Sequence, residues 1–138
     1  MTQLETSAGT LSIGTTRFGP VTIASKKIIF FPAGIPGFDD LKRYILIDHD
    51  EEGRLKWLQS IENPDVAFLL TDPNEYKPDY AITLKKAELE RLGAKNADDG
   101  KDLVFMVMML VSQAEKKVCI NLKGPIVFNG KAMRGVGS

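Results

Sequence analysis

The sequence predicts a mostly β protein, a small antiparallel barrel-like single domain with one short helix. Short runs rich in β-branched and aromatic residues recur along the chain, and Pro, Gly, Asn or Asp turn signals separate them at intervals of roughly ten residues. Only the stretch 84–92 combines helix-forming residues with a glycine directly after its end. We therefore expect about eight or nine short strands and a single helix.

The composition is ordinary for a soluble globular domain. The 138 residues are 43% hydrophobic and 26% charged, and 18 basic residues balance 18 acidic ones. A neutral total disfavours binding of nucleic acid or an anionic membrane through a cationic surface. The single cysteine excludes an intrachain disulfide, and no signal peptide or membrane-spanning run is visible, so we expect a cytoplasmic location.

The predicted domain organisation is simple. We expect a flexible N-terminal arm over 1–14, one domain over 15–136, and a candidate cloning remnant over 137–138.

A turn rich in proline and glycine lies at the centre of the predicted fold. Apolar runs at 28–31 and 44–47 flank the sequence P-A-G-I-P-G, which cannot continue a strand ladder. We expect two strands joined by a stiff turn in which Gly34 or Gly37 needs a positive φ. The ring of Phe38 is predicted to be a buried plug beneath this turn.

The remaining elements follow from the same signals. The helix at 84–92 has Thr83 as its expected N-cap, and 74–80 is predicted to be an ordered loop or a sheet edge. Strands are expected at 15–18 and 21–23 around Gly19-Pro20, at 56–61 with Trp57 in the core, at 66–70, at 103–111 in the centre of the sheet, and at 118–122 and 126–129 around Lys123-Gly124-Pro125.

Candidate catalytic or metal-binding residues are few. His49 lies in a charged loop without a second histidine in the sequence, so we interpret the loop as solvated, with a weak divalent-cation site as the alternative. Cys119 lies in an apolar run without an evident base, which favours core packing over reactivity. The methionines at 106, 108 and 109 favour core filling over a binding face.

The residues therefore predict an interaction module without catalytic, metal or cofactor sites. The turn before Phe38 lacks the Lys-Ser/Thr and the helix that a phosphate-binding loop needs. Tyr76, Asp79 and Tyr80 form the most informative group, because aromatic rings beside a carboxylate in a proline-containing loop suit a protein interface. Ordinary packing of the two tyrosines remains the alternative.

A series of motifs in order along the chain resembles the flagellar assembly factor family FliW. The motifs are F-P-A-G-I-P-G-F-D-D-L-K-R-Y-I-L, W-L-Q-S-I-E-N-P-D-V-A-F, T-D-P, P-D-Y and N-L-K-G-P-I-V-F-N. Each motif alone is weakly specific, but together they cover most of the chain, from 18 to 129.

The resemblance implies a small β-barrel-like fold, no enzyme activity and two protein partners. One partner is flagellin, bound in the cytoplasm. The other is CsrA, a small dimeric RNA-binding translational repressor that blocks flagellin synthesis. In this family flagellin holds the factor until export, and the freed factor then binds the repressor and lifts the block. We expect the two partners to antagonise each other, without direct contact to nucleic acid or membrane.

The resemblance directs attention to seven candidate partner-binding residues. They combine hydrogen-bonding groups with amphipathic rings, and their acidic share suits a basic repressor: Asn63, Asp65, Tyr76, Asp79, Tyr80, Asn121 and Lys123. Flagellin is expected to offer an amphipathic helical segment, which requires an apolar groove.

The chain departs from the family pattern in three places. The arm before Thr15 is longer than expected, the helix opens with L-K-K instead of acidic residues, and only three residues follow Arg134-Gly135. The alternative function is a small split-barrel flavin-binding protein or enzyme, which needs phosphate-binding groups that the sequence does not present convincingly. A nucleic-acid-binding barrel would need a basic, aromatic face.

Overall fold

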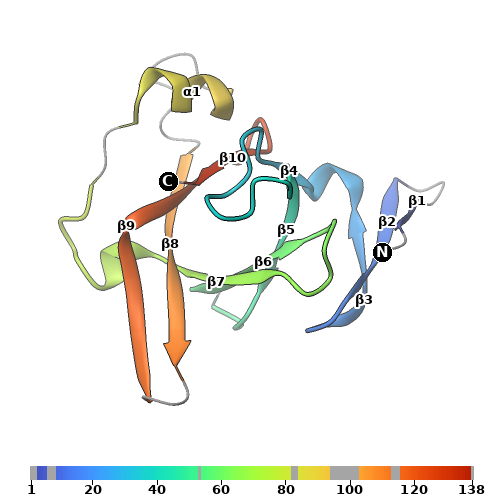
Figure 1. Ribbon diagram of the computed structural model, residues 1–138, viewed down its shortest axis with the longest axis horizontal. Coiled ribbons are helices and arrows are strands. Elements are labelled where there is room, and N and C mark those ends of the chain that lie inside the picture. Colours follow the sequence, from blue (N-terminus) through green and yellow to red (C-terminus); the bar gives the residue numbers. More distant parts are fainter. Residues whose placement is uncertain are drawn as a thin grey trace.

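The computed structural model describes residues 3–5, 9–52, 54–81, 84–93, 103–112 and 116–137. Within these ranges it is mostly β with one α-helix, which confirms the predicted fold class (Figure 1). The elements are β1 (Gln3–Glu5), β2 (Thr10–Thr15), β3 (Gly19–Ala24), the 3-10 turn η1 (Ser25–Lys27), β4 (Ile29–Phe30), β5 (Arg43–Asp48), β6 (Leu55–Ser60), β7 (Ala67–Thr71), the 3-10 turn η2 (Pro73–Glu75), α1 (Lys86–Leu92), β8 (Leu103–Ser112), β9 (Lys117–Asn129) and β10 (Arg134–Gly137).

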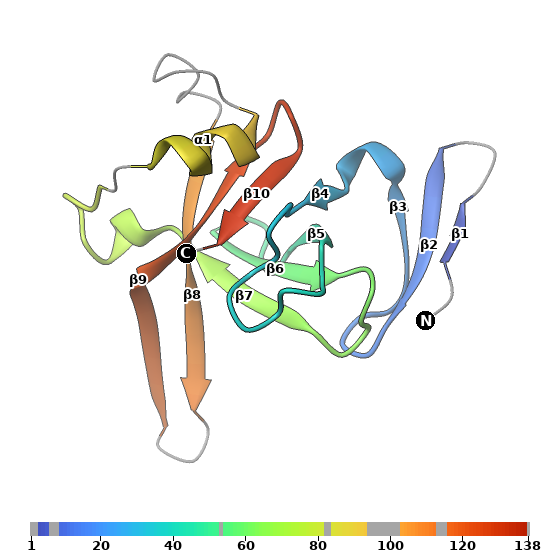
Figure 2. The ribbon, with the colours of Figure 1, turned by 45° about the horizontal axis from the view of Figure 1, so that its top comes forward.

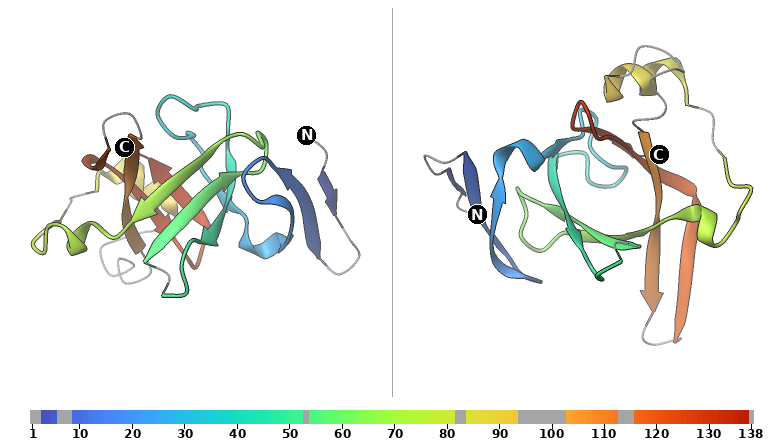
Figure 3. Two further views of the ribbon diagram at one scale, coloured as in Figure 1. Left: turned by 90° about the horizontal axis from the view of Figure 1, so that it is seen from below. Right: turned by 180° about the vertical axis from the view of Figure 1, so that it is seen from behind.

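Seven strands close into a barrel-like ring in the order β10-β4-β5-β6-β7-β8-β9, and β1, β2 and β3 form a separate sheet beside it (Figure 2). Neighbouring strands of the ring are antiparallel, except that β10 meets β4 in parallel through one residue pair, Arg134 opposite Phe30. The outer half of the β8–β9 hairpin projects away from the ring, as Figure 1 and the right view of Figure 3 show.

Aromatic rings fill the centre of the ring of strands. Phe31 packs edge-on against Tyr44 and Phe128, with centroid distances of 5.1 and 5.9 Å, a geometry that aromatic pairs favour. The buried cluster around them consists of Ile29, Phe31, Ile35, Tyr44, Leu58, Leu70, Met106, Ile126 and Phe128.

The closure of the ring depends on a contact between Phe31 and Gly135. A Cβ atom at Gly135 would lie 2.6 Å from Cε2 of the Phe31 ring and closer still to Cζ. Only glycine at position 135 therefore lets β10 lie against the aromatic side chain of Phe31. Strand β10 thereby reaches β4, and just before β10 begins, Met133 O accepts a hydrogen bond from Phe30 N at 3.0 Å.

The proline- and glycine-rich turn after β4 has the predicted backbone. Gly34 and Gly37 have φ values of 71° and 89°, and a Cβ at Gly34 would lie 2.8 Å from backbone atoms of Asp39. The predicted plug is wrong, because Phe38 is 38% exposed and packs edge-on against Phe68 at 5.0 Å. Ile35 is the residue of this turn that enters the core.

The N-terminal region contains a strand that the sequence does not predict. Strand β2 begins at Thr10, inside the expected arm over 1–14, because Leu11 and Ile13 bury their side chains against Ile45 and Ile61 on the outside of the ring. The division at residue 15 remains a prediction, but it does not foresee this strand. The expected hairpin exists, although its turn is 16–18 and Gly19-Pro20 begins β3.

The C-terminal half contains two further corrections. The strands predicted at 118–122 and 126–129 are one strand, β9, with a bulge: Met106 of β8 lies opposite Ile126, whereas Met108 lies opposite Asn121. The helix α1 begins two residues later than predicted. Its N-cap is Lys85, whose N–H donates to Glu88 Oε1 at 2.9 Å, and Gly93 ends it with a φ of 74°. The predicted N-cap Thr83 lies outside the described residues.

Cys119 is exposed, so the prediction that it packs in the core is wrong. Its position explains the error. Cys119 pairs with Leu110 in the outer half of the β8–β9 hairpin, which extends past the ring, and no other described strand or helix covers it there (Figure 1). An apolar sequence pattern does not distinguish this situation from a buried strand.

We predict that Gly135→Ala destabilises the fold by roughly 2–3 kcal/mol, because the added methyl group would overlap the Phe31 ring. Gly14→Ala is the matched control, since a Cβ there meets no atom within 4 Å, and it should change stability by less than about 0.5 kcal/mol. Urea denaturation midpoints measure both effects. Equal midpoints for the two variants would contradict the role assigned to the contact.

A second prediction concerns alkaline pH. Burial, with a smaller contribution from the Glu62 carboxylate, raises the pKa of Tyr44 to about 12, and its hydroxyl has no hydrogen-bond partner among the described residues. The unfolded chain therefore loses this proton first. The contribution of Tyr44 to the free energy of unfolding is therefore fully present below pH ~10. It falls as the pH rises towards 12, by at most about 1.4 kcal/mol per pH unit.

The variant Tyr44→Phe isolates this effect. It should lack this part of the alkaline loss, and at neutral pH it should be at least as stable as the parent, because it removes an unpaired buried hydroxyl. Urea denaturation at several pH values between 8 and 12 measures the difference. Parallel pH profiles for the two proteins would show that Tyr44 does not control it.

Candidate protein-binding surfaces

The loop that follows β7 is ordered by its own hydrogen bonds. Asp72 Oδ1 accepts from Asn74 N at 2.9 Å and begins η2. Asn74 Nδ2 then donates to Pro78 O at 3.2 Å and to Tyr80 O at 3.1 Å, which closes the loop on itself. The prediction of an ordered loop at 74–80 is confirmed.

Tyr80 joins this loop to β9. Its hydroxyl donates to Leu122 O at 2.7 Å, in the bulge of β9, and burial raises the pKa of Tyr80. Tyr80 is thereby placed beside β9 at Leu122, the residue that follows Asn121. Tyr76 is 50% exposed and Asp79 is also exposed. We call Tyr76, Asp79, Tyr80 and Asn121 the loop surface; Lys123 lies in β9, but its side chain is outside the described part of the structure.

Asn63 and Asp65 lie at the other end of β7 and serve the fold. Asn63 Oδ1 accepts from Asp65 N at 3.0 Å, which shapes the turn between β6 and β7. The Asp65 carboxylate accepts a hydrogen bond from the Thr16 hydroxyl, and Thr16 N donates to Pro64 O at 3.0 Å. These bonds fasten the β6–β7 turn to the β2–β3 turn, so the structure separates six of the seven predicted residues into two groups.

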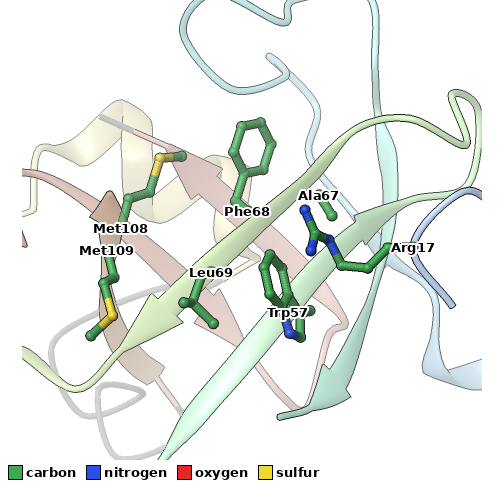
Figure 4. Close-up of a pocket in the computed structure, with 7 residues that line it drawn as sticks. All are labelled: Arg17, Trp57, Ala67, Phe68, Leu69, Met108 and Met109. Carbon is green, nitrogen blue, oxygen red and sulfur yellow. The ribbon is translucent and has the colours of Figure 1, made fainter. Parts of the chain in front are cut away.

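The connection between these turns creates an aromatic pocket (Figure 4). Arg17, in the β2–β3 turn, places its guanidinium 4.1 Å from the centroid of the Trp57 ring, within cation–π distance. The Trp57 indole N–H donates to His49 Nδ1 at 3.0 Å. The pocket has a volume of about 230 Å³ and is here called the tryptophan pocket; its lining residues are Arg17, Trp57, Ala67, Phe68, Leu69, Met108 and Met109.

This pocket corrects two sequence predictions. Trp57 was expected in the core, but it lies on the opposite face of β6 from Leu58, which enters the ring of strands. Met106 fills the core, as predicted, and the half-buried Met108 packs against the core cluster and also lines the pocket. Met109 is half-buried and lines the pocket. Sequence reasoning missed Arg17, because its approach to Trp57 depends on hydrogen bonds between two distant turns.

A second, larger pocket of about 500 Å³ lies between β3, β4, β5 and the inner halves of β8 and β9. Most of its lining is apolar, and its Lys56 and Asp48 form an ion pair with an N···O distance of 2.6 Å. Val104 is 50% exposed beside it. The lining residues of this large pocket are Ile23, Lys27, Ile29, Ile45, Leu46, Asp48, Lys56, Val104, Met106, Phe128, Asn129, Gly130 and Met133.

Two apolar pockets and an aromatic loop are features of a protein-binding domain. No helix in the described ranges is long and apolar enough to cross a membrane.

Comparisons with known proteins agree with this class. The family model described as FliW protein matches residues 12–136. The flagellar assembly factor FliW of Caldanaerobacter subterraneus subsp. tengcongensis is 36% identical over 127 residues, covering 91% of this chain and 83% of the relative. That of Alkaliphilus metalliredigens is 38% identical over 122 residues, covering 88% and 74% of the two chains. A crystal structure of the flagellar assembly factor FliW superposes with a TM-score of 0.80 at 31% identity, covering 92% of this chain and 86% of that one.

The chain belongs to the FliW family. It is a flagellar assembly factor and not an enzyme, which confirms the resemblance noted in the sequence and makes the alternative of a split-barrel enzyme wrong.

Proposed function

We propose that this protein binds flagellin in the cytoplasm and, when free of flagellin, binds and antagonises a CsrA-type RNA-binding translational repressor. Release of the repressor from its target then allows flagellin synthesis. The observation that carries this proposal is membership of the FliW family over residues 12–136. Three features of the structure support it: the large pocket, the loop surface, and the strands shared by both.

The large pocket suits the apolar face of a helix from flagellin. An amphipathic helix binds by laying apolar side chains from successive turns into a groove, and this pocket offers the partly exposed side chains of Ile23, Leu46 and Val104. Lys27 also lines this pocket, so its ammonium group can contact polar groups of the helix beside the apolar lining.

The loop surface suits the repressor. Tyr76 offers an exposed aromatic ring and Asp79 an exposed carboxylate, and a basic RNA-binding protein is attracted by acidic groups. Tyr80 is fixed to Leu122 O, so the loop loses little conformational freedom when a partner binds.

Strands β8 and β9 give a physical route for antagonism between the two partners. Their inner halves line the large pocket through Val104 and Phe128, whereas the bulge of β9 carries the hydrogen bond to Tyr80. If a helix bound in the pocket shifts the backbone of the bulge, it therefore also shifts Tyr80 and the loop surface. Such coupling requires that each partner bind the two arrangements unequally.

The flagellin site is tested with Val104→Glu, which places a carboxylate in the large pocket from an exposed position. We predict at least about tenfold weaker flagellin binding in a titration calorimetry experiment, because the charge loses hydration in an apolar contact. Val118→Glu is the matched control, since Val118 is 58% exposed on β9 and does not line the pocket. Equal losses for the two variants would place the flagellin site elsewhere.

The repressor site is tested with Asp79→Lys and Tyr80→Ala. Each variant, once shown to be folded by circular dichroism, should bind the repressor about tenfold more weakly or worse, while Asp79→Lys should bind flagellin normally. In a competition titration, flagellin added to the preformed complex should release the repressor. Repressor binding that is unchanged at saturating flagellin would contradict antagonism, and unchanged binding of both variants would contradict the loop surface.

A further inference from the structure

Strands β7 and β8 separate soon after they meet. Their pairing consists of Leu70 opposite Met108 and Thr71 opposite Val107, whereas the pairing of β7 with β6 continues to Ala67. On the β8 side, 67–69 therefore have no strand partner within the described pairing. The tryptophan pocket opens along this gap, with Leu69 on one side and Met109 on the other (Figure 4).

The free side of β7 presents backbone donors and acceptors. Ser60 N donates to Val66 O at 2.9 Å, so these two residues form a hydrogen-bonded pair of the β6–β7 ladder. Such pairs alternate in an antiparallel ladder, which makes Leu58 and Phe68 the next one. The N–H and C=O groups of Ala67 and the N–H of Leu69 then point away from β6 and into the gap, whereas the Leu70–Met108 pair turns the Leu69 C=O toward Met109 of β8. An edge of this kind is a template for an added strand.

The charge of the pocket indicates what the added strand carries. Arg17 is the only charged residue among those that line the tryptophan pocket, and it pairs with no carboxylate of the described residues. Its guanidinium is exposed and held over Trp57, with hydrogen-bond donors available. A carboxylate of a partner is the group that such a fork binds most strongly.

From this edge and this charge we infer a docking site for an extended acidic peptide. The geometry points to a segment of a partner protein that adds to β7 as a strand at Ala67 and Leu69. An apolar side chain of the segment enters the tryptophan pocket, and a carboxylate two residues away, on the same face of the strand, reaches Arg17. This site is separate from the large pocket, and the inference does not depend on whether flagellin binds there.

Asp65 is a positioning residue for this site. Its carboxylate accepts from the Thr16 hydroxyl and holds the turn that carries Arg17 above Trp57. This assigns a role to a residue that the sequence indicated only as a direct partner contact. A helix would suit the site less well, because it uses its own backbone groups internally and leaves those of Ala67 and Leu69 unpaired.

The test uses two synthetic peptides and the single tryptophan of the chain. The first peptide, acetyl-TLTETLT-amide, places leucine, glutamate and leucine on one face of a strand, and the second replaces its glutamate with lysine. We expect the glutamate peptide to change the fluorescence of Trp57 and to bind about tenfold more tightly than the lysine peptide. Equal affinities, or no binding of either at millimolar concentration, would overturn the proposal.

Variants of the protein test the role of Arg17. Arg17→Glu should reverse the preference between the two peptides, whereas Arg17→Lys should keep it in weaker form. Arg91→Glu, an exposed charge change on α1, is the control and should leave both affinities unchanged. Because Arg17 is exposed in a turn, the folding of each variant is checked by its circular dichroism. A preference that survives Arg17→Glu would overturn the assignment of this residue.

Amide hydrogen exchange distinguishes an added strand from other occupants. The glutamate peptide should slow exchange at Ala67 and Leu69, because their N–H groups become hydrogen-bonded. Binding without this protection means a different mode and overturns the strand proposal. Protection that is already present in the protein alone, and that is lost on dilution together with a dimer, identifies a second copy of the chain as the occupant and also overturns it.

Discussion

The flat contact between the Phe31 ring and Gly135 is the constraint on which the rest of the structure depends. It lets β10 meet β4 and so closes the ring, although only one residue pair joins these strands. The same ring packs against Tyr44 and Phe128, so it connects the first and last strands to the middle of the core. Because β10 also pairs with β9, the contact fixes the position of β9 in the ring of strands. The two pockets and the loop surface are built on strands of this ring.

Local signals in the sequence were sufficient where the backbone itself decides the structure. Gly34, Gly37 and Gly93 have the positive φ that their turns and helix end require, whereas Gly19-Pro20 and Gly124-Pro125 lie inside strands β3 and β9. Burial was less predictable. Trp57 and Cys119 lie in runs that the sequence predicts as strands, yet one strand turns the indole outward and the other carries the thiol past the ring.

The candidate site shows the same division between local and long-range information. The tyrosines of the loop could be identified from composition, because aromatic residues in a polar loop are unusual without a packing or binding role. The pairing of Arg17 with Trp57 could not, because it depends on the Asp65–Thr16 hydrogen bond between separate hairpins. Strand β7 connects these regions: one of its ends leads to the loop surface, and its free side faces the tryptophan pocket.

The projecting half of the β8–β9 hairpin has a consequence for how this protein changes over evolutionary time. Lys117, Val118 and Cys119 are exposed, so substitutions there remove little buried area and cost little folding free energy. The backbone pairing of the hairpin nevertheless holds each new side chain in a fixed direction. The projecting half of the hairpin is therefore where single mutations can create or abolish contacts with other molecules without affecting the core.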